Sequence, residues 1–288
     1  MRNKQLRILL AVTLTLNIIL AVIKLGAGYL YNSPSLVGDG FNSFFDIFIS
    51  VMLLIVMKTA SRAPDENHHY GHQKYEGLIF FGLGLFILFT TVVLGINTVK
   101  DFIAYFQGAE YVLPGTPALI VAIVSVFIKV FMFIINYRAY LKLKRPALKG
   151  DAINHLSDIF ATAVSIISIV LAKFNFYIFE YIGTLIICVI IINSSINIIK
   201  EAAYYLTDAS PSKKTVESIR ECILNVEGVI CVDDLKVRRH MNNYYVDVEV
   251  GINKNLTLKE AHDISEKVHS QVEANFKVLH CHVHINPH

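Results

Sequence analysis

Long apolar stretches alternate with short polar connections over the first 207 residues of the chain. Six apolar segments lie near residues 8–30, 36–58, 77–105, 116–141, 149–172 and 178–203. Each reaches the roughly 20 residues that a helix needs to cross a bilayer. From about residue 208 charged residues become frequent and apolar runs shorten. The pattern predicts an α-helical membrane protein with six transmembrane helices over residues 1–207 and a small soluble domain over residues 208–288.

The soluble region alternates between helix and strand patterns. A helix is expected from Ser212 to about Asn225, and a second helix after Thr257, which forms a capping box with Glu260. Strands are expected over residues 229–240, 244–252 and 278–285. This order is typical of a cytoplasmic α+β ferredoxin-like domain that lacks one strand. A domain of about 80 residues has a small core, so we expect it to dimerise.

Composition narrows the class of protein. The mean hydropathy is +0.52 and only 17% of the residues are charged, which excludes a disordered chain. The formal net charge of +3 is too small to indicate a nucleic-acid partner. The four cysteines form no C-x-x-C pair, and three of them lie in the soluble region, where we expect reduced thiols: Cys222, Cys231 and Cys281.

Positive charges gather on one side of the predicted membrane domain. Arg2, Lys4 and Arg7 flank the first span, and further basic residues lie between spans two and three and between spans four and five. The opposite side has only Lys100 and Lys173. Because positive residues favour the cytoplasm, the sequence predicts a multi-pass protein of the cell membrane with both termini cytoplasmic.

One pattern occurs twice inside these apolar spans. Residues 38–48 read GDGFNSFFDIF and residues 150–160 read GDAINHLSDIF, with six of eleven positions identical at an offset of 112. Asn42 and Asp46 are four residues apart, as are Asn154 and Asp158, so each pair shares one helix face. A carboxylate within a hydrophobic span is costly and usually functional.

The two pairs are expected to meet in the middle of the bilayer. Spans two and five run in opposite directions, and Asp46 and Asp158 each lie about 15 Å deep at 1.5 Å per residue. If the helices touch, the two aspartates and two asparagines form one cluster with a charge of −2. Hard oxygen ligands favour Mn²⁺ or Fe²⁺ over Zn²⁺. The alternative is that each aspartate caps or hydrogen-bonds a kinked helix.

Three other residues within the repeated pattern carry weaker signals. Asp39 and Asp151 are expected near the two mouths of the site, where they would guide cations, or else at solvated helix starts. His155 lies about 100° around the helix from Asn154 and is not expected to be a direct ligand.

With these motifs the chain resembles the cation diffusion facilitators. The resemblance covers six spans, the paired four-residue spacings on spans two and five, a histidine-rich loop after span two, and a small cytoplasmic domain. It implies a homodimer that exports divalent metal in exchange for protons. The implied transport site consists of Asn42, Asp46, Asn154 and Asp158. Zinc-handling members carry a His in place of Asn154, so the chain looks more like the manganese-handling members.

The resemblance implies two further features beside the membrane. Asp65, His68 and His72 match a peripheral metal site in the loop DENHHYGHQKYE, the alternative being a solvated loop. The two histidines suit one metal if the backbone between them is helical. Lys74 and Asp208 match a charge interlock at the membrane–cytoplasm junction, the alternative being two independent surface charges.

The soluble domain carries candidate ligands of its own. In resembling zinc transporters this domain binds metal between subunits, and the matching positions are Asp233, Asp247, His262, His284 and Asn286. Acid and amide residues at several of these positions weaken a zinc interpretation. On the last strand His280, His282 and His284 share one face by their period of two. The alternative is a polar face followed by a frayed tail.

The expected function is therefore Mn²⁺/H⁺ antiport out of the cytosol, with metal as cargo and with no enzymatic reaction, cofactor or nucleic-acid partner. One alternative is the same fold exporting Zn²⁺, Fe²⁺ or Co²⁺. Another is a membrane-anchored metal sensor, although an anchor does not need carboxylates in the middle of two spans. A membrane-embedded hydrolase is disfavoured, because the chain contains no nucleophile–base pair, no H-E-x-x-H motif and no phosphate-binding glycine loop.

Overall fold

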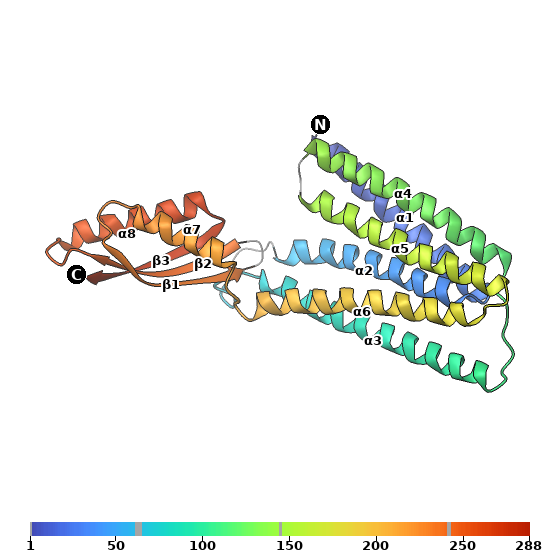
Figure 1. The fold of residues 1–288 in the computed structure, drawn as a ribbon. Coiled ribbons are helices and arrows are strands. Elements are labelled where there is room, and N and C mark those ends of the chain that lie inside the picture. Colours follow the sequence, from blue (N-terminus) through green and yellow to red (C-terminus); the bar gives the residue numbers. More distant parts are fainter. Residues whose placement is uncertain (1, 61–64, 144–145, 241–242) are drawn as a thin grey trace. The chain divides into compact units, whose positions relative to one another are not determined.

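Six long helices make up the N-terminal part of the chain (Figure 1). The computed structural model describes the chain except residues 1, 61–64, 144–145 and 241–242, and side chains are described except at residues 2–8, 10, 53–60, 143 and 146–151. The helices are α1 (Arg2–Leu30), α2 (Pro34–Ala60), α3 (Lys74–Phe106), α4 (Thr116–Leu143), α5 (Pro146–Lys173) and α6 (Ile178–Leu206). Each covers one of the six predicted spans.

The side chains of these helices are distributed as a bilayer requires. Large apolar side chains face outward, with Phe89 68% exposed and Phe127 71% exposed, whereas Lys24, Asp39 and Glu180 are fully buried. Among the described residues, five helices contain a stretch long and apolar enough to cross a membrane, namely α1, α3, α4, α5 and α6. The helix α2 has 27 residues and carries the first copy of the repeated pattern. The prediction of a helical membrane domain is confirmed.

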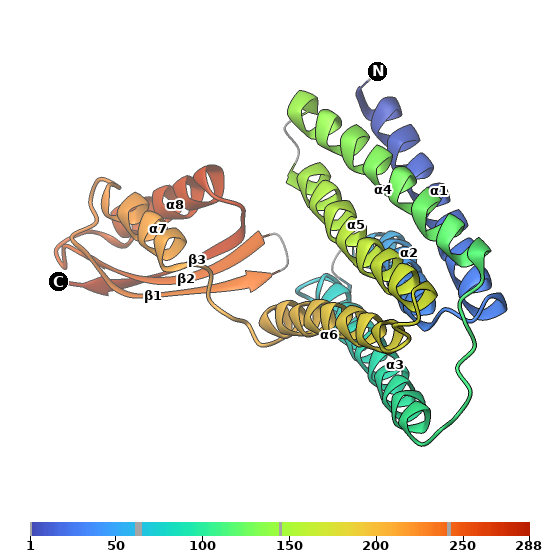
Figure 2. The same cartoon turned by 45° about the vertical axis from the view of Figure 1, so that its right-hand side comes forward.

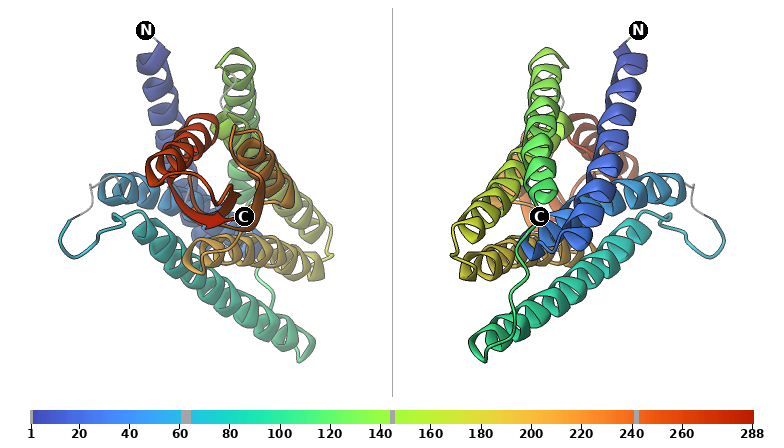
Figure 3. Two further views of the ribbon diagram at one scale, coloured as in Figure 1. Left: turned by 90° about the vertical axis from the view of Figure 1, so that its left-hand side faces the viewer. Right: turned by 90° about the vertical axis from the view of Figure 1, so that its right-hand side faces the viewer.

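Close helix packing sets the arrangement around the repeated pattern. The helix α4 packs against both α1 and α5, and Figures 2 and 3 show α1 and α4 diverging towards the N-terminus of α1. Glycines let α1 and α2 approach each other: a Cβ atom on Gly40 would lie 3.0 Å from the backbone nitrogen of Leu25. Small residues at such contacts are the usual means of close packing between membrane helices. Gly40 in the first pattern copy therefore allows α2 to lie close against α1.

The soluble domain is an α+β sandwich with one sheet. Its elements are α7 (Lys213–Leu224), β1 (Cys231–His240), β2 (Asn243–Ile252), α8 (Leu258–Asn275) and β3 (Val278–Pro287). The sheet order is β1-β2-β3, with β1 antiparallel and β3 parallel to β2. Both helices lie on one face of this sheet (Figure 2). This is the predicted ferredoxin-like order without its fourth strand.

The core of this domain explains its local structure. Ile264, Val268 and Val272 recur every fourth residue along α8, so they form one apolar stripe against the sheet.

The start of α8 has the predicted capping box. The Thr257 side chain accepts a hydrogen bond from the Glu260 backbone, and the Glu260 side chain accepts one from the Thr257 backbone. The hydrogen bonds that its carboxylate accepts from Thr257 hold the pKa of Glu260 below its usual value.

The chain forms two compact units. One comprises residues 1–55 and 82–198, and the other comprises residues 56–81 and 199–288. The connection between α2 and α3 and the C-terminal end of α6 thus belong to the same unit as the soluble domain. The division into a transport domain and a soluble domain near residue 208, which was inferred from composition, stays a prediction.

Candidate metal site

The repeated pattern brings α2 and α5 together. Asn42 on α2 donates a hydrogen bond from Nδ2 to Oδ1 of Asp158 on α5, over 2.8 Å. A cavity of about 280 Å³ is lined by all four predicted ligands, together with residues of α3 and α6: Asn42, Asp46, Asn154, Asp158 and, among others, Ile87 and Ser194. The matched spacings therefore place two carboxylates and two amides around one space, near the middle of both helices.

A lysine on α4 completes this site, and the sequence interpretation missed it. Lys129 Nζ donates to Oδ2 of Asp158 over 2.5 Å and to Oδ1 of Asn17 over 2.9 Å. It also lies 3.7 Å from Oδ2 of Asp46. The side chain of Lys129 is fully buried. A single lysine in the middle of an otherwise apolar span is the signal that could have found it, because buried ionisable residues in membrane helices are usually functional.

The charges of this site are unequally satisfied. Asp158 receives bonds from Asn42 and Lys129, whereas Oδ2 of Asp46 is buried and accepts no hydrogen bond from the described residues. One lysine cation against two carboxylates leaves a formal deficit of one positive charge. A cation entering the cavity would therefore meet one unsatisfied carboxylate oxygen and one oxygen that a tethered ammonium occupies.

A second buried lysine corrects the expectation for Asp39. Lys24 Nζ lies 2.7 Å from Oδ2 of Asp39, and both side chains are fully buried. Lys24 also donates to Oγ1 of Thr162 over 2.9 Å and to Oγ of Ser43 over 3.4 Å. Asp39 is therefore neither at a mouth nor at a solvated helix start. The close packing of α1 on α2 encloses it, and Lys24 neutralises it.

Two other residues of the repeated pattern, His155 and Asp151, were also singled out from the sequence. His155 is buried, and its Nδ1 lies 3.7 Å from Oδ2 of Asp158, which is beyond hydrogen-bond distance. It adjoins the site without bonding to it. The side chain of Asp151 lies outside the described residues.

The loop candidates come together without the helix that the expectation assumed. Residues 65–73 form turns, Gly71 has a φ of 81°, and α3 begins at Lys74. Asp65 bridges the two histidines: its Oδ1 lies 3.2 Å from Nδ1 of His68, and its Oδ2 lies 3.1 Å from Nε2 of His72. Although desolvation of the carboxyl group opposes it, hydrogen bonding from His68 and Asn67 lowers the pKa of Asp65. One ligand atom from each residue lies within 4.8 Å of the others.

The two interlock candidates form an ion pair. Lys74 Nζ lies 2.9 Å from Oδ1 of Asp208, and both side chains are partly exposed. Asp208 has a φ of 53°, which places it in the turn after α6. Arg238 lies 4.0 Å from the other carboxylate oxygen. The chain thus connects the start of α3, the end of α6 and strand β1 through charged side chains.

The candidates in the soluble domain do not all meet within one protomer. Asp233 contacts Asn286, which donates to Oδ2 over 2.8 Å, and His288, whose Nε2 lies 3.1 Å away. The hydrogen bond from Asn286 is the main cause of the lowered pKa of Asp233. Asp247, His262 and His284 join no cluster of ligand groups among the described residues. Their participation in a metal site stays a prediction that concerns two protomers.

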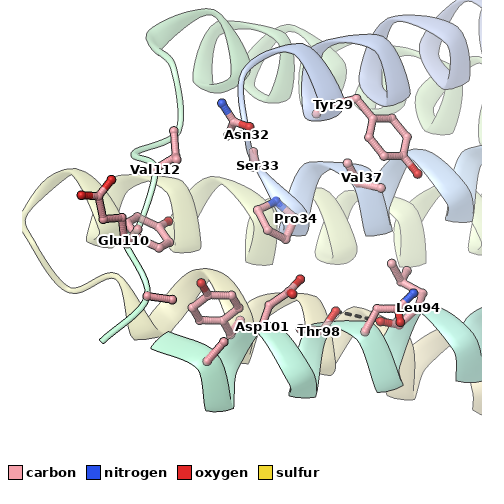
Figure 4. A pocket seen from close by; sticks show the side chains of 16 residues that line it. Tyr29, Asn32, Ser33, Pro34, Val37, Leu94, Thr98, Asp101, Glu110 and Val112 are labelled. Carbon is pink, nitrogen blue, oxygen red and sulfur yellow. Dashed lines mark hydrogen bonds between the residues drawn. The ribbon is translucent and has the colours of Figure 1, made fainter. Parts of the chain in front are cut away.

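A larger cavity lies at the end of the helical unit where α1 turns into α2. It has a volume of about 500 Å³ and is lined by the turn between α1 and α2, by α3 and by the connection between α3 and α4. Figure 4 shows Asp101 of α3 and Glu110 of that connection among the side chains that line it. Burial raises the pKa of Tyr111, which also lines it. Asn97 and Asp101, four residues apart on α3, both line it, so it has one Asn/Asp pair where the smaller cavity has two, from α2 and α5.

Comparison with known proteins identifies the family. The profile of the "Cation efflux transmembrane domain" matches residues 10–207, and that of the "Cation efflux protein, cytoplasmic domain" matches residues 211–288. The "Uncharacterized transporter MJ0449" of Methanocaldococcus jannaschii is 33% identical, over 94% of both chains. Two proteins of Bacillus subtilis are also similar. The "Manganese efflux system protein MneS" is 29% identical over 96% of this chain and 93% of its own, and MneP is 24% identical over 96% and 94%.

A solved structure, "MamM-CTD E289A", aligns with 27% of this chain and all of its own at 25% identity, with a TM-score of 0.26. The family profiles together span nearly the whole chain, from the first helix to the last strand. The chain therefore belongs to the cation efflux family of transporters, the cation diffusion facilitators.

Proposed function

We propose that this chain exports Mn²⁺ from the cytosol in exchange for protons. The cargo site is the cavity between α2 and α5, with Asn42, Asp46, Asn154 and Asp158 as ligands. The observation that carries this proposal is the convergence of two matched Asn/Asp pairs, from antiparallel helices, on one cavity. Two Bacillus subtilis relatives are named as manganese efflux proteins, which supports the choice of metal.

Ligand chemistry supports Mn²⁺ over Zn²⁺. All four proposed ligands offer oxygen, and two are carboxylates, which suits a hard divalent cation. Among the described residues no histidine lines the cavity, and Nδ1 of the buried His155 lies 3.7 Å from Oδ2 of Asp158. The same fold exporting Fe²⁺ or Co²⁺ remains the second candidate, because these ions also accept oxygen ligands. Zn²⁺ is the third.

Lys129 is proposed to compete with the metal for Asp158 and so to keep the charge of the site balanced. The ammonium group of Lys129 neutralises Asp158 and has a second partner in Asn17. A divalent ion that binds between Asp46 and Asp158 repels this ammonium at short range, so Lys129 withdraws towards Asn17. When the metal leaves, Lys129 returns to Asp158. The site thus never holds two bare carboxylates.

Protons complete the cycle. Carboxylates must be deprotonated to bind metal, so metal entry from the cytosol releases protons and protons arriving from outside favour metal release. A rocking motion of the helices around a site near the membrane centre would alternate its access. No covalent reaction is required, and we assign the chain no enzymatic activity and no cofactor.

Topology and assembly follow the sequence predictions. We place the protein in the cell membrane with both termini in the cytoplasm, residues 1–207 as the transport domain, and residues 208–288 as a dimerisation and regulatory domain. The match of a cytoplasmic cation efflux domain to residues 211–288 supports the homodimer. In that dimer, Asp233, Asp247, His262 and His284 are the proposed ligands of a site between subunits.

The features beside the membrane have supporting roles. Asp65, His68 and His72 are proposed as a peripheral metal site near the start of α3. The ion pair between Lys74 and Asp208 is proposed as the interlock that keeps the membrane–cytoplasm junction together. A sensor that is merely anchored in the membrane is disfavoured, because the buried charged groups around Asp158 serve no purpose in an anchor.

Metal uptake into proteoliposomes tests the proposal. Mn²⁺, Fe²⁺, Co²⁺ and Zn²⁺ would be supplied in parallel, with and without a pH gradient and with a protonophore. We expect Mn²⁺ uptake that the gradient drives and the protonophore abolishes, and none with Asp158→Ala. Equal Mn²⁺ uptake by Asp158→Ala would overturn the site, and gradient-independent uptake would overturn the proton exchange.

A further inference from the structure

Three potential metal ligands gather where α8 meets the last strand. His269 and Glu273 lie one turn apart on α8, and His280 lies on β3. Oε1 of Glu273 is 3.3 Å from Nε2 of His269 and 3.5 Å from Nδ1 of His280. One ligand atom from each residue lies within 4.8 Å of the others. None of the three belongs to the ligand set that the family resemblance implies.

His280 lies directly after a bulge in β3. The pairing steps from Tyr244 with Val278 to Tyr245 with His280, so Leu279 is an extra residue in β3. Regular pairing resumes at His280, which keeps the period of two with His282 and His284. His280 contacts Glu273 of α8 and so adds a third potential ligand to the pair on that helix.

The backbone of β3 orients two of the ligands. Nδ1 of His269 lies 2.8 Å from the carbonyl oxygen of Cys281, and a carbonyl only accepts, so Nδ1 carries the proton. In the neutral ring this leaves the lone pair of Nε2 directed at Glu273. The backbone N–H of Cys281 donates to Oε1 of Glu273 over 3.1 Å. Metal-binding histidines are typically held in this way, with the other ring nitrogen bonded to a carbonyl or carboxylate.

This arrangement places two acceptors against each other. The lone pair of neutral His269 faces a carboxylate oxygen at 3.3 Å, and the ring of His280 stands 5.4 Å from that of His269, centroid to centroid. Only a proton or another cation between them relieves the repulsion. The side chains are 29%, 30% and 58% exposed for His269, Glu273 and His280, so an ion and a water ligand have access from solvent.

We propose that His269, Glu273 and His280 form a Zn²⁺ site within each protomer, chemically distinct from the cargo site. Two imidazoles and one carboxylate, with an open fourth position, are a ligand set that suits Zn²⁺ and disfavours Mn²⁺. The proposal does not depend on the identity of the cargo. A bound ion would connect α8 to β3, and since it binds only the folded domain, it would stabilise that domain.

This site gives the soluble domain a metal preference different from that of the membrane cavity. The cavity offers four oxygen ligands, whereas this site offers two nitrogens and one oxygen group. The transporter would thus respond to cytosolic Zn²⁺ through the packing of α8 on the sheet while carrying another ion.

The test uses the full-length protein in detergent and a matched pair of histidine variants. His280→Ala removes a ligand, and His282→Ala removes a histidine two residues along the same strand that joins no ligand cluster among the described residues. Glu273→Gln is the second variant, because its amide oxygen still accepts the hydrogen bond from Cys281. Zn²⁺ bound per protomer would be measured by equilibrium dialysis, and circular dichroism would verify folding.

We expect His280→Ala and Glu273→Gln each to bind one Zn²⁺ fewer per protomer than the wild type and His282→Ala. Co²⁺ in place of Zn²⁺ should give a visible absorption band that the same two variants lose. Mn²⁺ at equal concentration should not displace the Zn²⁺. Equal Zn²⁺ binding by all four folded proteins would overturn the proposal and would indicate that a proton bridges His269 and Glu273. Proteoliposome transport of Mn²⁺ would be unaffected by either result, so this test is separate from that of the cargo site.

Discussion

Two buried lysine–aspartate pairs lie in the membrane domain, and they differ in their surroundings. Lys24 and Asp39 are closed in by Ser43 and Thr162, which supply further hydrogen-bonding partners. Lys129 is paired with Asp158, which lines a cavity of about 280 Å³. Beside them stands a second carboxylate, Asp46, with an oxygen that accepts no hydrogen bond from the described residues.

The difference shows that a buried ion pair is not a function in itself. The first pair has matched charges and fully buried side chains, and it connects α1 with α2. The second pair has one carboxylate too many and a cavity beside it, so a cation can compete for it. Burial raises the desolvation cost of both pairs. Only the second pair lies beside a cavity in which a metal cation could take the place of the lysine.

The largest effect on stability is expected from Lys24→Met. It leaves Asp39 as an uncompensated buried charge, and breaking such a pair typically costs about 3–5 kcal/mol. The double variant Lys24→Met/Asp39→Leu should recover most of this loss, because an apolar replacement of both partners is close to neutral. Thermal unfolding followed by far-ultraviolet circular dichroism suits this protein, which contains no tryptophan. A double variant as unstable as the single one would show that the pair is not a self-contained structural unit.

Lys129→Met should act on metal affinity more than on stability. It removes a competing positive charge next to Asp158, and at short range this should tighten Mn²⁺ binding by at least about tenfold. Turnover should fall, because the lysine no longer returns to displace the ion. Titration of purified protein with Mn²⁺ measures the affinity, with Lys100→Met, an exposed lysine on α3, as the control. Unchanged affinity would mean that Lys129 and the metal do not compete.

Asn154→His should change selectivity by a smaller factor. It adds an imidazole to a cavity of oxygen ligands, which should shift competition from Mn²⁺ towards Zn²⁺ on the order of tenfold. Uptake of one ion in the presence of the other measures this shift. Asn193→His, on an exposed position of α6, should leave the ratio as it is in the wild type. If both variants behave alike, Asn154 is not a ligand.

The smallest effect is expected at the ion pair that is partly exposed. Lys74 and Asp208 are 45% and 40% exposed, and such pairs contribute about 0–1 kcal/mol to stability. Asp208→Asn should therefore unfold at nearly the same temperature as the wild type, and far above Lys24→Met. A loss as large as that of Lys24→Met would place the junction among the essential ion pairs.

The sequence predicted the elements and the two Asn/Asp pairs that line one cavity, because both rest on local spacing. Apolar runs mark α1 to α6, and a four-residue spacing puts Asn42 with Asp46 on one helix face. The sequence did not predict that two buried lysines pair with the aspartates. Lys24 and Lys129 occur singly in apolar spans, and only the packing of α1 and α4 against α2 and α5 directs them at aspartates.

Asp39 and His280 show the other kind of failure. The depth of Asp39 was judged from the hydropathy of its own segment, whereas its burial depends on Gly40 letting α1 come close. His280 was grouped with His282 and His284 by the period of a regular strand, and that period could not show that Glu273 of α8 lies 3.5 Å from His280. In both cases a neighbouring element decides the environment of the residue, and no local pattern records it.

The central claim is that Asp158 binds the cargo while Asp39 serves the fold. The isosteric variants Asp158→Asn and Asp39→Asn test it directly, with Mn²⁺ uptake into proteoliposomes measured per molecule of folded protein. We expect Asp158→Asn to take up no more Mn²⁺ than empty vesicles, and the folded fraction of Asp39→Asn to transport close to the wild-type rate. Transport by Asp158→Asn at the wild-type rate, or equal loss in both variants, would contradict it.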